Sequence, residues 1–489
     1  MSWVLAQRGV RPSLLFAIAL FGALWGSAVA LADINALYLC VALIGCAFVL
    51  LDFRIGVVLL ILLMPISSSK IFPHEMLGIV GLNPLNLVLM GTLASYLLHG
   101  ASDGSLRRFF PQPLLWLYIA PIVAAGIVGS RHLDDIAWGY FIFDKLGFDS
   151  VPSYLRDQVL KPLFSVLYAL LVGAAVVKSE KPEKFLLPTL VSIWIMGATV
   201  IVFVAQSGVG LDQLASDTSR GFLSPLGMHA NDLGRLYAVA YALLLFPFAE
   251  SKDIRLKLAL LASMGVVIVA LVLTFSRGAF LGFVVVNVLF LLWRRDSKAI
   301  FLFGLLATVA LFFLPDAVYE RLESGFGERL NVLGVLDAVS AGRIEGIWAP
   351  LIPDALRSPI YGSGLWSILW SDAMRNGFGV DLPPVAQAHN AYLETVLDMG
   401  VAGLILLCAY FIHVWRGFRK LSDDTALSPV LRGFYQGGAA GLLSYLVAGV
   451  SGGYLTPKPE QVFLWLAIGM MYGQHARKKE GRNDARELA

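Results

Sequence analysis

Four separate segments of the chain place arginine or histidine beside an apolar run. His389 and Asn390 directly precede one run in AHNAYLETVLDMGVAGLILL, and Arg220 precedes another in RGFLSPLGMHANDLG. Arg277 lies between two runs in LTFSRGAFLGF, and Arg343 lies in GRIEGIW. Arginine binds phosphate through planar, bidentate hydrogen bonds, and histidine exchanges a proton near neutral pH. Together these residues indicate a site that holds a phosphate-bearing substrate and takes a proton from it or its partner.

Most of these residues also have a plain structural explanation. A single arginine at the end of a membrane helix usually anchors it among lipid headgroups. Helix capping or complementing the helix dipole would explain the polar residues at the two helix starts: His229, Asn231, His389, Asn390, Glu394 and Asp398. Arg277 differs, because it lies in a very short turn with apolar residues on both sides. A charged side chain so close to the apolar part of the membrane costs free energy, and such a residue is functional by default.

The composition requires a membrane to position these residues. The chain has 489 residues, of which 58% are hydrophobic and only 15% charged. A soluble domain with this balance would lack the charge to keep its surface solvated. The three cysteines lie within apolar runs without metal-ligand spacing, so we interpret them as small core residues. We therefore expect an all-α polytopic membrane protein of about 12–14 transmembrane helices.

Fourteen apolar runs are candidate spans. They cover residues 14–32, 35–51, 55–69, 78–98, 112–129, 161–178, 185–206, 229–249, 255–274, 277–293, 299–314, 392–415, 431–449 and 460–474. The second and third are joined only by Asp-Phe-Arg, so whether residues 35–69 form one span or two stays open.

The positions of the basic residues predict which loops lie on the cytoplasmic side. With the N-terminus inside, every proposed inner loop carries Lys or Arg, and so does the tail HARKKEGRNDAR. We therefore expect both termini in the cytoplasm. Arg220, Arg277, Arg343 and His389 then all lie on the outer face, against the usual bias for positive charge inside.

Two outer segments are long enough to have structure of their own. Residues 130–160 mix aromatic and charged side chains, which predicts an interfacial helix or a re-entrant segment. Residues 315–391 form one long loop, with a helical pattern around RIEGIWAPLIPDALRSP. We divide the chain into N-terminal spans at 1–204, a core at 205–415 that includes this loop, and C-terminal spans with a basic tail at 416–489.

Several common chemistries have no motif here. The chain has no Asp-x-Asp pair for a metal-bound nucleotide sugar, and no Walker loop, zinc spacing or nucleophile elbow in a suitable context. We expect no metal, no cofactor and no nucleic-acid partner.

The motifs around Arg277, Arg343 and His389 resemble the bacterial O-antigen ligase and O-antigen polymerase superfamily. In this family a block with arginine, tryptophan, proline and Gly-x-Gly precedes a second block of His-Asn-x-Tyr/Phe-Leu and Gly-x-x-Gly. The matching residues here are Arg343, Trp348, Pro359, Gly362 and Gly364, then His389, Asn390, Tyr392, Leu393, Gly400 and Gly403. The segment around Arg220 is similar to a further family block, although Arg220 is adjacent to its glycine rather than spaced from it. The resemblance covers roughly residues 205–415.

The resemblance implies a glycosyltransferase at the periplasmic face of the bacterial inner membrane. Its donor would be a glycan on undecaprenyl diphosphate, and its acceptor lipid A-core or a growing glycan, in lipopolysaccharide or exopolysaccharide biosynthesis. His389 would deprotonate an acceptor hydroxyl that attacks with inversion, while Arg277, Arg343 and Arg220 hold the diphosphate without a metal. Asn390, Tyr392, Asn231 and Trp348 would support them. Asn390 has two roles open: orienting His389 or capping the helix.

Other functions remain in competition. A ligase and a repeat-unit polymerase share donor and mechanism and differ in the acceptor, and a variant would use a protein acceptor. A small-solute or bicarbonate transporter belongs to another class, but the sequence lacks a pair of interrupted helices or mid-membrane carboxylates. Lys458 and Glu460, before the last span, would lie near the acceptor entrance.

Overall fold

The computed structural model describes most of the chain. It covers residues 34–70, 72–76, 79–103, 110–137, 148–210, 221–295, 343–376 and 385–487, together with Gly26, Tyr140 and Leu146. Arg220, the predicted span at 299–314 and, apart from Gly26, the predicted span at 14–32 lie outside these residues.

Helices make up nearly all of the regular structure, because a helix satisfies its own backbone hydrogen bonds in lipid. The N-terminal half contains α2 (Ile34–Leu51), α3 (Phe53–Leu63), α4 (Pro84–Asp103), α5 (Gln112–Leu114), η2 (Leu115–Ile119), α6 (Ala120–Gly129), η3 (Leu133–Asp135), α8 (Val151–Leu155), η4 (Arg156–Leu160), α9 (Lys161–Val177), η5 (Pro182–Phe185) and α10 (Leu186–Ser207). Between α3 and α4, β1 (Glu75–Met76) pairs antiparallel with β2 (Ile79–Val80), with Glu75 opposite Val80.

The C-terminal half carries the elements that position the site. They are η7 (Ser224–Leu226), α12 (Ala230–Glu250), α13 (Ile254–Val272), α14 (Arg277–Arg294), η8 (Ile344–Trp348), α17 (Ala349–Arg357), η9 (Ser367–Trp370), α18 (Asp372–Asn376), α19 (Ala391–Ser422), α20 (Pro429–Ala448), η10 (Gly449–Ser451), η11 (Pro459–Gln461) and α21 (Val462–Glu487).

Seven helical segments among the described residues are long and apolar enough to cross a membrane. They are Gln112–Gly129, Val151–Val177, Pro182–Ser207, Ala230–Glu250, Ile254–Val272, Arg277–Arg294 and Ala391–Ser422. The predicted all-α polytopic membrane fold is confirmed. Five more of the predicted spans fall on α2, α3, α4, α20 and α21.

The predicted span at 55–69 is too long. The segment 35–69 forms two helices, α2 and α3, and Asp52 caps the second by accepting a hydrogen bond from the Arg54 amide. However, α3 ends at Leu63, just before Pro65, and its 11 residues extend about 16 Å. This is about half the thickness of a bilayer core, so α3 does not cross on its own.

The predicted interfacial segment at 130–160 also needs correction at its C-terminal end. Residues 151–160 belong to one continuous helical segment, Val151–Val177, rather than to a separate interfacial element. The predicted span begins only at residue 161, next to Pro162, which lacks an amide donor. The structure absorbs this proline with the π-helical turn η4, in which the Lys161 amide bonds to the carbonyl of Arg156.

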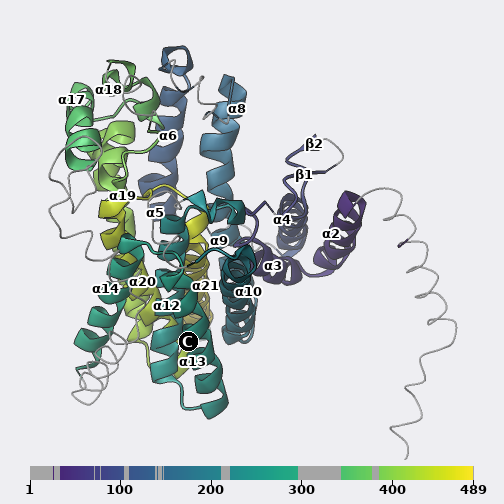
Figure 1. Ribbon diagram of the computed structural model, residues 1–489. Helices are drawn as coiled ribbons and strands as arrows, with labels where there is room; N and C mark the ends of the chain where they lie inside the picture. Colours follow the sequence, from purple (N-terminus) through teal and green to yellow (C-terminus); the bar gives the residue numbers. More distant parts are fainter. Residues whose placement is uncertain are drawn as a thin grey trace, which may run out of the picture.

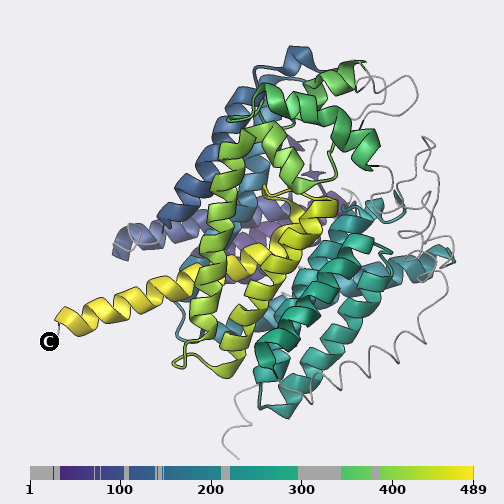
Figure 2. The same ribbon diagram turned by 90° about the vertical axis from the view of Figure 1, so that its left-hand side faces the viewer.

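The centre of the bundle is α12, which packs along α20 and also contacts α13 and α14 (Figure 1). Its backbone comes very close to α20: a Cβ on Gly437 would lie 2.4 Å from the carbonyl oxygen of Ala242. Small residues at such contacts let membrane helices approach closely. The last helix, α21, packs against α9 and also contacts α20 and α12. In Figure 2 the yellow helix α21 runs obliquely, and its C-terminal part extends away from the bundle.

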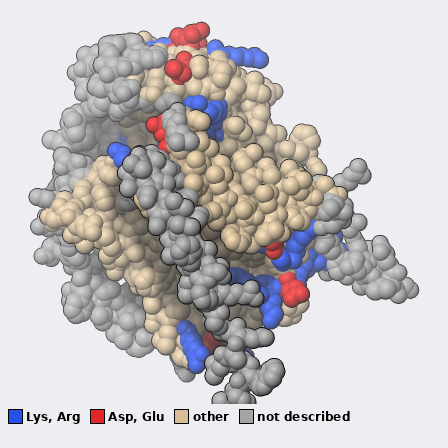
Figure 3. Space-filling model, turned by 90° about the vertical axis from the view of Figure 1, so that its right-hand side faces the viewer, with Lys and Arg blue, Asp and Glu red and all other residues tan. Residues whose placement is uncertain are grey.

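Loops predicted to share the cytoplasmic side contact one another at one end of the bundle. Arg54 donates to the carbonyl of Lys178 (3.3 Å), and Arg294 pairs with Glu250 (2.8 Å). Arg432 approaches the same Glu250 carboxylate at 3.6 Å. Figure 3 shows Lys and Arg toward both ends of one face, with a broad area of uncharged side chains between them. These loops therefore lie together at one end of the bundle, and the assignment of that end to the cytoplasm stays a prediction.

The described parts of the long outer loop are ordered over the opposite end. The helical pattern predicted around RIEGIWAPLIPDALRSP is confirmed by η8 and α17, and η9 and α18 follow. Leu365 donates its amide to the carbonyl of Ala125 at the end of α6 (3.0 Å), and the amide of Ala137 bonds to the carbonyl of Leu369 (2.9 Å). The loop is therefore fastened to the N-terminal half.

Candidate functional site

His389 and Asn390 form the entry to α19. Asn390 is its N-cap: the side-chain oxygen accepts hydrogen bonds from the amides of Tyr392 (3.0 Å) and Leu393 (3.2 Å). His389, half-buried, has a φ of +51°, a left-handed conformation that is strained for a residue with a Cβ. Buried Glu394 accepts the amide of Ala388 at 2.6 Å and holds the turn from inside the helix. The Asn390 side-chain oxygen thus caps the helix.

Two of the predicted supporting residues fasten this turn to other elements. The indole N–H of Trp348, the last residue of η8, donates to the carbonyl of Ala388 (2.8 Å). The hydroxyl of Tyr392 donates to the carbonyl of Leu446 near the end of α20 (2.7 Å). His389 is therefore held between the outer loop and α20.

Arg343 and the start of the helix that carries Arg277 lie at the same end of α20. A guanidinium nitrogen of Arg343 donates to the carbonyl of Ser451 in η10 (2.7 Å). Arg277 is the first residue of α14, after the N-cap Ser276, as predicted for a tight turn between two spans. Its neighbour Gly278 packs on Ser451 so closely that a Cβ there would lie 2.6 Å from the Ser451 hydroxyl.

Residues 446–451 are thus a common support for three helix starts. Gly278 in α14, Arg343 before η8 and Tyr392 in α19 each contact this short segment. Arg277, Arg343 and His389, three of the four predicted basic residues, thus stand on elements that share this support. The signal for Ser451 in the sequence is weak, since it stands in an ordinary loop string, GVSGGY.

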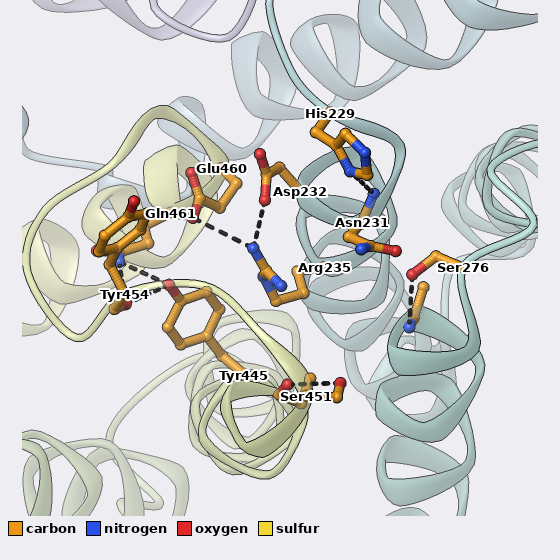
Figure 4. A network of polar contacts seen from close by, with 12 residues as sticks. His229, Asn231, Asp232, Arg235, Ser276, Tyr445, Ser451, Tyr454, Glu460 and Gln461 are labelled. Atoms are coloured by element: carbon orange, nitrogen blue, oxygen red, sulfur yellow. Dashed lines mark hydrogen bonds and ion pairs between the residues drawn. The ribbon is translucent and has the colours of Figure 1, made fainter. Parts of the chain in front are cut away.

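Asn231 lies in the first turn of α12, beside the turn that precedes Arg277. Its amide donates to Nδ1 of His229, the N-cap of α12 (3.2 Å). Figure 4 shows Asn231 on α12 near Ser276 on α14. Gly234 allows this approach, because a Cβ there would lie 2.3 Å from the Cβ of Ala279. His229 therefore has the capping role that the sequence allows.

A buried ionic network lies next to this turn and was missed at the sequence level. Arg235 of α12 is only 4% exposed and pairs with Asp232 and with the equally buried Glu460 (3.6 Å). Figure 4 shows its guanidinium between these two carboxylates. The backbone of Gly453 packs on it, since a Cβ there would lie 2.8 Å from the guanidinium carbon. The network fastens the segment after η10 to the start of α12.

Lys458 and Glu460 have altered acidity in this network. Burial raises the pKa of Glu460, with Asp232 acting in the same direction and Arg235 against it. Burial lowers the pKa of Lys458, against the attraction of nearby carboxylates. The Lys458 ammonium lies over the ring of Tyr454, 4.3 Å from its centroid, and 5.3 Å from that of Trp366. Lys458 is thus held by aromatic faces as well as by charge.

The Gly-x-Gly segment clamps a kink in α19. Gly400 interrupts the helix with a φ of +66°, and the amide of Val401 instead bonds to the carbonyl of Pro359 (2.8 Å). Gly362, at a φ of +71°, packs directly on the backbone of Asp398. The buried Asp398 carboxylate accepts both the amide and the hydroxyl of Ser367 at 3.0 Å. Asp398 therefore anchors the outer loop, a more specific role than complementing the helix dipole.

Among the described residues, the candidate site contains positively charged side chains and not a group of metal ligands. In the parts of the chain that the structure covers, no three His, Cys, Asp or Glu side chains are grouped to hold a metal ion. Arg277 and Arg343 are the groups suited to an anionic ligand, and Arg277 stands at a helix N-terminus where the first amides of α14 favour negative charge.

Comparison with known proteins identifies the part of the chain that carries this arrangement. No curated protein matches the chain. Residues 259–408 match the model of the O-antigen ligase family. The match runs from α13 through Arg277 and Arg343 to His389 and the kink of α19, within the predicted core at 205–415. This part of the chain is thus similar to the O-antigen ligase family.

Proposed function

We propose that the protein transfers a glycan from undecaprenyl diphosphate to an acceptor hydroxyl at the periplasmic face of the bacterial inner membrane. One observation carries the proposal: the start of α14 through Gly278, Arg343, and the start of α19 through Tyr392 all contact residues 446–451 at one end of a membrane bundle. This shared support would bring two cations suited to a diphosphate and a residue suited to take a proton to the end of the bundle where a lipid-linked donor presents its headgroup.

Arg277 and Arg343 hold the diphosphate of the donor, with Arg220 in support. Departure of the glycan leaves additional negative charge on the terminal phosphate. Fixed cations aimed at this charge stabilise the transition state without having to reorganise. Arg343 is already oriented by its bond to Ser451, and Arg277 by the capped start of α14.

His389 acts as the general base. Its imidazole removes the proton of an acceptor hydroxyl while that oxygen forms a bond to the anomeric carbon of the donor sugar. The bond from the anomeric carbon to the phosphate oxygen breaks, and undecaprenyl diphosphate leaves with the electron pair. Attack from the face opposite the leaving group inverts the anomeric configuration. The proton on His389 then passes to solvent or to the leaving phosphate.

The supporting residues act through position. Trp348 and Tyr392 hold the turn that carries His389 between the outer loop and α20, and Asn390 caps α19 beneath it. Asn231 packs beside the turn that precedes Arg277. We favour a ligase that moves a finished glycan onto lipid A-core or an exopolysaccharide acceptor over a polymerase of repeat units.

The lipid-linked glycans of a strain lacking the protein test this proposal. Long glycan accumulating on undecaprenyl diphosphate, with an unmodified acceptor, is the expected result for a ligase. Single repeat units without long chains would instead assign polymerisation. An unchanged profile of lipid-linked and surface glycans would overturn the proposal and favour transport of a small solute.

A further inference from the structure

One face of the η8–α17 segment exposes a row of large apolar side chains. Ile344, Ile352, Leu356, Ile360 and Tyr361 are all exposed, Leu356 to 68% and Tyr361 to 79%. Ile352 and Leu356 are four residues apart, so they lie on one side of α17, and Ile360 and Tyr361 follow in the turn after the helix ends at Arg357. We call these five residues the apolar stripe. Single exposed apolar residues are ordinary, but a continuous row needs a partner.

The π-helical turn keeps Ile344 in line with the rest of the stripe. The amide of Ala349 bonds to the carbonyl of Ile344, five residues back, rather than four as in an α-helix. The wider turn places Ile344 on the same side as Ala349, one turn before Ile352. The stripe therefore extends along the whole of η8 and α17.

The opposite face of α17 packs against the rest of the protein. Leu351 is fully buried and Ala355 nearly so. The Asp354 carboxylate accepts the amides of Asp372 (3.0 Å) and Ala373 (3.1 Å) at the start of α18. The helix cannot turn its stripe inward without breaking these contacts, so the stripe stays on the outside.

The stripe is continuous with the lipid-facing side of a membrane span. The amide of Ala402 in α19 bonds to the carbonyl of Ile360 (3.1 Å), which places the end of the stripe beside the kink of that span. From there Val401, Ile405 and Ile412 are exposed along one face of α19. This face belongs to a segment long and apolar enough to cross the bilayer. In Figure 2 the green outer segment lies over the end of the bundle next to α19.

We propose that the apolar stripe is inserted into the leaflet at this end of the bundle, with lipid acyl chains as its partner. The helix would lie at the boundary between headgroups and acyl chains, where amphipathic helices and tyrosine are favoured. Arg357, at the edge of the stripe and 57% exposed, extends to the headgroup level while pairing with Asp354 and Asp372.

The insertion has a consequence for the site that rests on the proposed function. Arg343 directly precedes η8, and Trp348 at its end bonds to the turn that carries His389. A helix held at a constant depth therefore holds both residues at the level of the headgroups. A diphosphate attached to a membrane lipid lies at that level.

Fluorescence quenching in the full-length protein tests the insertion without using activity. In a C40A/C46A/C408A background, Leu356→Cys is labelled with an environment-sensitive fluorophore and the protein is reconstituted into phospholipid vesicles. Asp134→Cys, an exposed position in η3 at the same end of the bundle, is the matched control. A lipid with a nitroxide on its acyl chain should quench the Leu356 label several-fold more than the control label. Aqueous iodide should show the reverse order.

Two results would overturn the proposal. Equal quenching by iodide at both positions would mean that the stripe faces water. Protection of the Leu356 label from both quenchers would mean that protein covers the stripe, from this chain or from a second copy. If Leu356→Cys does not fold, Ile352→Cys one turn earlier gives the same measurement. Loss of transfer activity in these variants has no bearing on the result, which separates this inference from the proposed function.

Discussion

The indole of Trp348 donates a hydrogen bond to the carbonyl of Ala388, the residue directly before His389. The two residues are 40 positions apart, and the bond links the outer loop to the turn that begins α19. Since Arg343 lies at the other end of the same helical turn, this bond couples the positions of a candidate anion-binding residue and a candidate base.

Trp348→Phe should lower the rate of glycan transfer more than donor binding. Phenylalanine keeps the aromatic packing but removes the bond to Ala388, so the His389 turn loses one of its constraints. A small displacement of a catalytic group can reduce turnover by about ten- to a hundredfold. Steady-state kinetics of the purified protein should show a reduced kcat with KM nearly unchanged.

The control for this variant is Trp116→Phe, since Trp116 also donates its indole N–H to a neighbour but is exposed on the N-terminal half. It should keep full activity. A Trp348→Phe protein as active as the wild type would remove Trp348 from the positioning of His389.

Asn390→Ala should destabilise the protein by about 1 kcal/mol, the usual effect of losing a helix cap. Asn390→Ser should recover most of that stability, because serine also accepts hydrogen bonds from the first helical amides. Thermal unfolding in detergent measures both. If the serine variant regains stability but not transfer activity, Asn390 also orients His389, and the capping role alone is insufficient.

The sequence predicted the helices best where the hydrophobicity of a continuous segment is enough to identify a span. Apolar runs between charged loops located every span that the structure describes, because hydrogen bonding in lipid leaves few alternatives to a helix. It failed where a compensating turn is needed: the predicted span begins at residue 161, yet the π-helical turn η4 continues the helix from Val151. Likewise, the apolar content of residues 55–69 concealed that α3 ends at Leu63.

The sequence could predict which residues belong to the candidate site, but it could not predict the contacts that these residues make. Arg277, Arg343 and His389 stand out because charge beside an apolar run is costly. Arg235 obeys the same rule inside α12, but it was overlooked because Glu460, its partner, lies far along the chain. The support given by Ser451 depends on backbone carbonyls and a close glycine contact, and no residue pattern encodes these.

Arg277→Lys should lose most of the transfer activity even though it keeps the charge. Lysine cannot offer the planar pair of donors that matches a phosphate. Loss of one such oriented donor typically lowers turnover by about a hundred- to a thousandfold. Arg357→Lys, an exposed arginine at the same end, is the matched control and should be nearly unaffected. Full activity of Arg277→Lys would reduce Arg277 to an anchor among lipid headgroups.

Glu460→Gln should flatten the pH dependence of stability. Burial raises the pKa of Glu460, so the folded protein binds its proton more tightly than the unfolded chain does. This tighter proton binding stabilises the folded state fully below the ordinary carboxyl pKa of about 4.3. The stabilisation is lost as pH rises through the raised pKa of Glu460. The Tm of the wild-type protein should therefore fall as the pH rises over this range, and the Tm of the variant should fall less. Glu183→Gln, at the opposite end of the bundle, is the control and should show the same slope of Tm against pH as the wild type. An equal slope of Tm against pH in Glu460→Gln and the wild type would contradict the prediction.

His389→Ala should abolish glycan transfer while the amount of protein in the membrane stays unchanged. Removing a general base lowers the rate by about a hundred- to ten-thousandfold, and alanine tolerates the left-handed backbone here no better than histidine does. His132→Ala controls for the loss of a histidine at the same end, since His132 is held by Asp135 and stacks on Trp370 away from the site. Transfer is measured as glycan moved from the lipid-linked donor, with protein level followed by immunoblot. Substantial activity in the His389 variant would exclude it as the base, whereas rescue of His389→Ala by added imidazole would assign the missing proton acceptor directly.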